Sequence, residues 1–314
     1  MRAAWVIGGG GLLGSALSRC LREDGHQLYV PEFRFQWNDD HVLGAQLECA
    51  LGQFCHFAQQ ARQWAIYWAA GIGTMHNAAS SMVGETEALR RMVQRLVEAH
   101  SLPSVPGRFA LASSAGAIYA GSTDPIITEL SAPEPTTAYA RAKLEQESIV
   151  HRLSREMTGM TTLAARVSTL YGSDQVSNKK QGLLTSLSRH IVRGLPIQIY
   201  VPLDTIRDYI HADDAARTVV DALNAAPRDA STTRIVAAEL PTTISEIVGI
   251  FRRVAKRPPR IITSARQSTA LYSRRIQFRS IVRPGLQLKN RVNLVVGIAR
   301  LLEAERARFT AGDK

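Results

Sequence analysis

The order of hydrophobic and polar residues at the start of the chain predicts a strand, a turn and a helix. An apolar run over residues 3–7 predicts a buried strand. Glycines follow at positions 8–11 and 14, and residues 15–21 then read as an amphipathic helix. A strand that passes through a glycine turn into a helix is typical of the first unit of a parallel α/β sheet.

The alternation of strands and helices continues to about residue 225. Short apolar runs predict further strands over 28–30, 64–71, 108–114 and 161–167. Apolar residues at helical spacing predict helices over 80–100, 138–157, 181–193, 215–225 and 243–254. Residues 38–63 are mixed and helical in part, and beyond Pro258 the pattern predicts no clear order. The fold class is therefore α/β.

Two of the predicted helices are preceded by residues whose side chains can cap a helix N-terminus. We expect Asp213 or Asp214 to cap the helix over 215–225, in a structural role. Thr242 or Thr243 is expected to cap the helix that continues to about Val254.

Composition is that of an ordinary globular domain, with 45% hydrophobic and 21% charged residues among 314. No apolar run approaches the roughly 20 residues that span a bilayer, and the glycine turn interrupts what would otherwise resemble a secretory signal. Three cysteines, at 20, 49 and 55, match neither a disulfide framework nor a zinc motif. A reducing cytoplasm is the expected compartment.

The net charge of +11 favours anionic partners. It is uneven, because no acidic residue lies between Glu246 and Glu303. Two interpretations stay open: a solvated basic face that meets a membrane surface or an acidic partner, or a few arginines that hold a diphosphate. The basic residues of this stretch are Arg252, Arg253, Lys256, Arg257, Arg260, Arg266, Arg274, Arg275, Arg279, Arg283, Lys289, Arg291 and Arg300.

The glycine turn has the spacing Gly8-x-x-Gly11-x-x-Gly14. In a dinucleotide site the first glycine permits the turn, the second lets the backbone approach a pyrophosphate, and the third lets the helix lie against the strand. The first helical residues, Leu12 and Leu13, then offer unpaired N–H groups to the phosphates. This turn is the predicted cofactor site, and no metal site is expected.

A carboxylate follows the second predicted strand. Glu32 lies 18 residues after Gly14, the spacing at which an acid accepts hydrogen bonds from the adenosine ribose. It favours NAD over NADP, whereas Arg34 could accept the extra phosphate of NADP; Glu32 could also be a solvated loop residue. The small residues Ala69, Ala70 and Gly71 end the next strand, where a cofactor could lie over them.

Tyr139 and Lys143 are four residues apart on one helix, so both project from the same face. Oxidation of an alcohol needs a base for the hydroxyl proton. A tyrosine with a pKa near 10 is protonated at neutral pH, so its pKa is too high for it to act as that base. An ammonium one turn away favours the phenolate and lowers that pKa. Ser114, or Ser113, could polarise the substrate oxygen at the end of the strand over 108–114.

With Tyr139 included, the chain resembles the extended short-chain dehydrogenase/reductases, of the NAD-dependent nucleotide-sugar epimerase/dehydratase kind. The resemblance covers residues 1 to about 225, with a less specific piece over 275–280. The matching pieces are Gly8-x-x-Gly11-x-x-Gly14, Glu32, Ala69-Ala70-Gly71, Ser113 to Tyr119, Tyr139-x-x-x-Lys143, Arg166 to Gly172 and Arg207 to Asp214.

The resemblance implies a Rossmann domain, a doubly wound parallel sheet, over 1–172, to which 205–225 returns. It implies a smaller, mainly substrate-binding α+β domain over 173–314. Tyr139 is then the base, Lys143 also holds the nicotinamide ribose, and Arg166 belongs to the cofactor site. Arg207 and Arg275 contact a nucleotide-sugar substrate, although Arg207 could instead form an ion pair. The family also implies a homodimer built on the helices over 80–100 and 138–157.

Some family features are absent. Ala115 stands where many members have the catalytic Ser or Thr, Met82 where a helix asparagine is frequent, and residues 200–204 replace a glycine-rich turn. The Asp-Glu pair of the 4,6-dehydratases is replaced by Ala115-Gly116-Ala117, and no cysteine stands near the site. What remains is oxidation and reduction at one carbon.

The predicted function is an NAD-dependent nucleotide-sugar epimerase acting at C4 of the sugar. The alternative is an NAD(P)H-dependent reductase of a 4-keto nucleotide sugar or of another carbonyl substrate. A dinucleotide sensor or a nucleic-acid-binding protein is disfavoured, because neither needs Tyr139, Lys143 and a serine together.

Overall fold

The computed structural model describes residues 1–71, 79–99, 102, 105–173, 182–263, 275–282 and 291–312. Arg266, Arg274, Arg283 and Lys289 of the basic stretch, and residue 181 of a predicted helix, lie outside these ranges. None of the helices within them has both the length and the apolar composition needed to cross a bilayer.

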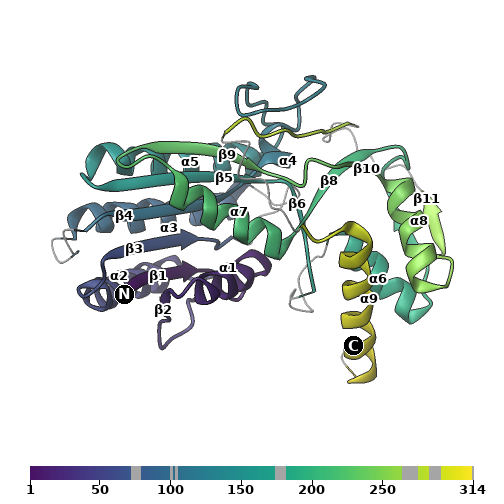
Figure 1. The fold of residues 1–314 in the computed structure, drawn as a ribbon, viewed down its shortest axis with the longest axis horizontal. Helices are drawn as coiled ribbons and strands as arrows, with labels where there is room; N and C mark the ends of the chain where they lie inside the picture. The colour runs from purple at the N-terminus through teal and green to yellow at the C-terminus, as the bar shows by residue number, and fades with distance from the viewer. Residues whose placement is uncertain are drawn as a thin grey trace.

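A parallel sheet of six strands dominates the N-terminal part of the molecule, in the order β2-β1-β3-β4-β5-β9 (Figure 1). The direction of winding reverses between β1 and β3, so the sheet has its switch point there. The strands are β1 (Arg2–Ile7), β2 (Gln27–Tyr29), β3 (Gln63–Trp68), β4 (Gly107–Ser114), β5 (Met160–Val167) and β9 (Ser231–Val236).

Helices cover both faces of this sheet, because alternate strand residues are apolar on each side. Helices α1 (Leu12–Glu23) and α7 (Ala212–Ala225) bury one face. Helices α2 (Asp40–Ala58), α3 (Ala79–Glu98) and α5 (Ala138–Glu156) bury the other, and a short helix α4 (Ala115–Ile118) follows β4. The doubly wound arrangement confirms the predicted fold class.

A smaller group of elements lies beyond the sheet (Figure 1). Helices α6 (Leu183–Arg193), α8 (Ile244–Ala255) and α9 (Leu294–Thr310) share a separate core. Beside them lie a three-stranded sheet of β6 (Thr169–Tyr171), β8 (Ile206–His211) and β10 (Pro241–Thr243), and the pair β7 (Ile197–Ile199) and β11 (Ile261–Thr263).

The segment over 205–225 returns to the large sheet in a different way from that expected. Its helix α7 packs on α1, but its strand β8 pairs with β6 and β10 rather than with the large sheet. The last strand of the large sheet is β9, which pairs with β5 and lies in the range assigned to the substrate domain. The boundary at residue 172 itself stays a prediction.

The two predicted helix caps have different outcomes. Neither Asp213 nor Asp214 caps α7, because its N-cap is His211, whose Nδ1 accepts from the Asp213 N–H at 3.3 Å. Asp214 instead accepts a hydrogen bond from the Val292 N–H at 2.9 Å. At α8 the prediction is confirmed for Thr243, which forms a reciprocal capping box with Glu246.

We expect Gly14→Ala to destabilise the fold by at least about 2 kcal/mol, because a Cβ there has no room. That atom would lie 2.1 Å from the Gly8 carbonyl oxygen, and this backbone cannot move without opening the turn. Urea unfolding measures the change. Gly52→Ala in α2 is the matched control, since a Cβ at Gly52 meets nothing within 4 Å. Equal stability of the two variants would contradict the close approach.

Candidate active site

A cavity of about 290 Å³ lies where the carboxyl ends of β1, β3, β4 and β5 meet the first turns of α1 and α5. It therefore sits at the switch point of the sheet, where open parallel sheets bind ligands. Its lining consists of Gly10, Gly11, Leu12, Leu13, Ala69, Ala70, Gly71, Glu85, Ala112, Ser113, Ser114, Tyr139, Lys143, Val167, Ser168 and Leu170.

The glycine turn is built for close backbone contact. Gly8 has φ of +87°, and a Cβ there would lie 2.6 Å from the Ala70 backbone, so β1 and β3 can end side by side only with glycine at this place. The Gly11 N–H closes the turn on the Gly8 carbonyl at 2.9 Å. The predicted residues Gly8, Gly11 and Gly14 and the tip of β3 are thus brought together.

The start of α1 suits an anionic group. Its N-cap, Gly11, provides no side-chain cap, and the N–H groups of the first helical turn have no acceptor within a helix. Leu12 and Leu13 supply such N–H groups and both line the cavity. These residues fit the pyrophosphate of a dinucleotide, which would lie on the turn with its charge against the positive end of the helix.

Glu32 and Arg34 lie just beyond β2, on the outer side of β1. Both are exposed, because Phe33, Phe35 and Trp37 alternate with them and pack toward the core. Neither belongs to the cavity lining. Since β2 is parallel to β1, both residues follow the strand end on the same edge as the glycine turn, and their contacts with the adenosine ribose stay a prediction.

Helix α5 carries Tyr139 and Lys143 into the cavity. Thr137 caps it, accepting from the Ala140 N–H at 3.2 Å, so Tyr139 lies in the first turn. The Lys143 Nζ is 5.7 Å from the centre of the Tyr139 ring. It donates to the Gln146 side chain at 2.9 Å and to the Ala112 carbonyl at 3.3 Å. The predicted pair therefore shares one buried site.

Burial is the main influence on the protonation of the pair, and neighbouring groups modify it. Burial of the hydroxyl raises the pKa of Tyr139 to about 12, against a hydrogen bond from Ser114 that lowers it. Burial lowers the pKa of Lys143, and the carboxylates of Glu85 and Glu147 raise it. Without a further positive charge beside it, the phenol of Tyr139 holds its proton at neutral pH.

The two neighbouring serines differ in their partners. Ser114 hydrogen-bonds to Tyr139. Ser113 donates to the Glu147 carboxylate at 2.6 Å and is buried. Only Ser114 is thus joined to Tyr139 by a described hydrogen bond, and it is the better candidate for the polarising hydroxyl.

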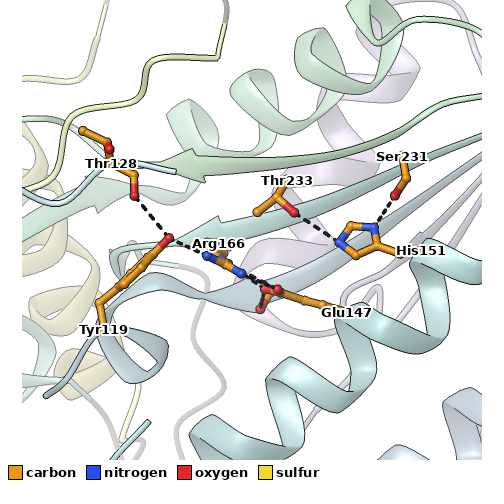
Figure 2. Close-up of polar contacts among 8 residues, drawn as sticks. Tyr119, Thr128, Glu147, His151, Arg166, Ser231 and Thr233 are labelled. Atoms are coloured by element: carbon orange, nitrogen blue, oxygen red, sulfur yellow. Dashed lines mark hydrogen bonds and ion pairs between the residues drawn. The ribbon is translucent and has the colours of Figure 1, made fainter. Parts of the chain in front are cut away.

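Arg166 lies in a buried network rather than among the cavity residues (Figure 2). Its guanidinium binds the Glu147 carboxylate with contacts of 2.7 and 3.0 Å, and it also donates to the Tyr119 hydroxyl. Ser113 and Arg166 are register partners on β4 and β5, so Glu147 reaches both from α5. In this arrangement Arg166 supports the site from behind, and its predicted cofactor contact has no counterpart in the cavity lining.

Arg207 and Arg275 come near one another outside this cavity. Arg207 lies on β8 and donates to the Ile206 carbonyl at 2.7 Å. Ile206 also bridges to Arg275. The backbones at these two positions, far apart in sequence, thus lie near one another in the smaller part of the molecule. The contact of Arg207 and Arg275 with a substrate stays a prediction.

Two acidic residues of the site were not among the predicted ones. Glu147 follows Lys143 by four residues, so it continues the face that carries Tyr139. Glu85 follows the buried Met82 by three residues and precedes the buried Leu89 by four. A carboxylate on an apolar helical stripe, and an acid in line with a catalytic pair, are signals that could have identified both residues.

The chain is similar to known proteins in sequence and in fold. The model of the "NAD dependent epimerase/dehydratase family" matches residues 4–238. The chain is 28% identical over 116 residues to dTDP-4-dehydro-6-deoxyglucose reductase of Escherichia coli. That match covers 37% of this chain and 36% of the relative, so the chain spans about a third of the relative's length.

Solved structures share the fold over nearly the whole chain. UDP-glucose 4-epimerase of Thermus thermophilus, solved with NAD, has a TM-score of 0.75 and 19% identity, covering 98% of this chain and 99% of its own. RMD of Pseudomonas aeruginosa, solved with NADPH, has a TM-score of 0.78 and 18% identity, covering 98% and 100%. At these identities the likeness is one of fold.

The buried ion pair predicts a large effect on stability. We expect Glu147→Gln to destabilise the protein by about 3 kcal/mol or more, because the Arg166 guanidinium would stay buried without its counter-charge. Urea unfolding measures this change. Glu145→Gln on the same helix is the control, since its exposed pair with Arg90 should contribute about 0.5 kcal/mol at most. A loss for Glu147→Gln as small as that of the control would refute the assignment.

Proposed function

Because the chain belongs to the NAD-dependent epimerase/dehydratase family, we propose that it is a nucleotide-sugar epimerase that acts at C4 of the sugar. The observation that carries this proposal is a single cavity that joins the glycine turn of β1 to Ser114, Tyr139 and Lys143. The fold shared with a UDP-glucose 4-epimerase solved with NAD supports it.

Bound NAD supplies the hydride acceptor and donor. Once the Tyr139 phenol has released its own proton to solvent, its oxygen takes the proton of the sugar hydroxyl, and the Ser114 hydroxyl holds the same substrate oxygen. Lys143 keeps a positive charge beside the phenol, which favours the phenolate during this step. After the keto sugar turns, Tyr139 returns the proton as hydride is delivered to the other face of the carbon. The chain's own residues thus move one proton out and back.

Elimination of water is disfavoured by the residues that follow Ser114. Dehydration needs an acid near the reacting carbon, whereas α4 begins with Ala115-Gly116-Ala117 directly after the strand. The apolar side chains at 115 and 117 are buried and offer no proton. This local sequence favours chemistry confined to one alcohol or carbonyl carbon.

The second candidate is a reductase of a 4-keto nucleotide sugar or another carbonyl. The relative in Escherichia coli is named as a reductase of a keto sugar, and the related Pseudomonas aeruginosa structure holds NADPH. Arg34, exposed two residues after Glu32, suits the extra phosphate of NADP. In this reaction Tyr139 donates its proton once, and the oxidised cofactor leaves.

Two further proposals concern the whole molecule. A homodimer would place α3 and α5 against their copies, and the outer surface of these helices carries the charged residues Glu87, Arg90 and Glu145. The number and spacing of the cysteines, at 20, 49 and 55, match no disulfide framework, which suits a reducing compartment such as the cytoplasm.

The cofactor and the reaction are tested together. We expect purified protein to retain NAD through dialysis and to invert C4 in a panel of UDP-, GDP- and dTDP-sugars followed by NMR. Tyr139→Phe should lower turnover by about a thousandfold while the cofactor stays bound. Tyr29→Phe, whose hydroxyl bonds to Gln53 at the surface, is the control. Consumption of NADPH with a keto sugar would select the reductase, and activity retained in Tyr139→Phe would exclude both candidates.

The serines give a separate prediction. Ser114→Ala should lower kcat/KM by about a hundredfold, because it removes the hydroxyl that bonds to Tyr139. Ser113→Ala should cost no more than about tenfold, since it removes one hydrogen bond to Glu147 behind the site. Steady-state kinetics of the two variants decide which serine polarises the substrate oxygen. The opposite order of effects would assign the polarising role to Ser113.

A further inference from the structure

Glu85 places a carboxylate in the cavity that the proposed reaction does not use. It lies in the first half of α3, and its side chain reaches the loop after β3, where a Cβ on Gly71 would lie 3.3 Å from its Oε2. Among the described residues that line the cavity, Glu85 is the only carboxylate and Lys143 the only cation. The site therefore contains three ionisable groups rather than two.

Other described acidic residues on α2, α3 and α5 have the following positions and partners. Glu147 on α5 is paired with Arg166 of β5. Asp40, at the start of α2, lies against the backbone of Gly84, where a Cβ would be 3.2 Å from its Oδ1. Glu87 pairs with Arg90 and Arg91 outside the cavity. Of the acids of α3, Glu85 is the one in the described lining of the cavity that also holds Tyr139 and Lys143.

The negative charge of Glu85 raises the pKa of both Tyr139 and Lys143. Burial is the largest cause of the raised pKa of Tyr139, and the Glu85 carboxylate shifts that pKa in the same direction by a smaller amount. The carboxylate also raises the pKa of Lys143, whose described hydrogen-bond acceptors are neutral groups of Gln146 and Ala112. In a buried site a nearby charge is weakly screened, so one carboxylate can influence both groups.

We propose that Glu85 is a positioning residue whose negative charge, in the cavity that it shares with Tyr139 and Lys143, opposes ionisation of the phenol and favours the protonated amine. The proposal rests on the proposed function, which makes Tyr139 the group that exchanges a proton with the substrate. The resting phenol then holds its proton, and it must release that proton before it can act as the base of the proposed reaction.

This role differs from a structural one in what it predicts. Glu85→Gln keeps the length and planarity of the side chain and its capacity to accept hydrogen bonds, but removes the charge. A packing role would change stability or binding and leave the titration of Tyr139 in place. A charge role moves that titration to lower pH, because a neutral neighbour no longer opposes the phenolate.

The test measures the ionisation of residue 139 directly, without a substrate. Tyr139 is replaced by a trifluorinated tyrosine, whose ring fluorines make the phenol acidic enough to titrate while the protein is folded, and fluorine NMR follows the resonance against pH. In the Glu85→Gln background we expect the midpoint to fall by about one pH unit, a tenfold change in the ionisation ratio.

Two control variants test whether a shift in the titration midpoint is due to the charge of Glu85. Glu87→Gln, on the same helix with its carboxylate outside the cavity, should leave the midpoint unchanged. Glu85→Asp keeps the charge and should restore most of the original midpoint. A midpoint in Glu85→Gln equal to that in Glu87→Gln, or equal shifts in Glu85→Asp and Glu85→Gln, would overturn the proposal.

Failure of this inference and failure of the proposed function have different signatures. If Tyr139→Phe is inactive and the fluorinated residue titrates independently of Glu85, only the role of Glu85 is wrong. If Tyr139→Phe remains active, the assignment of Tyr139 is wrong whatever the titration shows.

Discussion

A buried ion pair between Glu147 and Arg166 fixes helix α5 over the carboxyl ends of β4 and β5. The pair is bidentate, and Ser113 and Tyr119 satisfy further hydrogen-bonding capacity around it, so the cost of burying both charges is offset by several hydrogen bonds. Tyr139 and Lys143 lie on the same face of α5 as Glu147, two turns and one turn earlier, respectively. Their position above the sheet therefore depends on this pair.

The second constraint acts at the other side of the cavity, where β1, β3 and α1 meet without side chains between them. A Cβ at Gly8 would meet the Ala70 backbone at 2.6 Å, and one at Gly14 would meet Gly8 at 2.1 Å. The turn must consequently be made of glycine if α1 is to start beside the strand ends. The same closeness that the packing requires leaves backbone N–H groups as the surface offered to a ligand. Fold and binding site thus share one sequence requirement.

Much of this could be predicted from the sequence, because it depends on neighbours along the chain. The glycine turn, the strand ends at Ala69–Gly71 and Ser113–Ser114, and the pair on α5 are each local patterns. The partner of Ser113, the burial of Arg166 and the pairing of β9 with β5 depend on elements that only the folded chain brings together. Glu85 shows the same limit: its spacing places it on the apolar stripe of α3, but only the packing of α3 against α5 brings it into the cavity that Lys143 lines.

The late position of β9 in the chain has a consequence for synthesis on the ribosome. Strand β5 is buried along its whole length in the finished protein, and its outer edge is covered by β9. The intervening segment, with β6, α6, β8 and α7, must leave the ribosome before that partner exists. Until then β5 presents an open, apolar edge of the kind that recruits other strands. Nascent chains stopped before β9 should therefore depend on chaperones far more than completed ones.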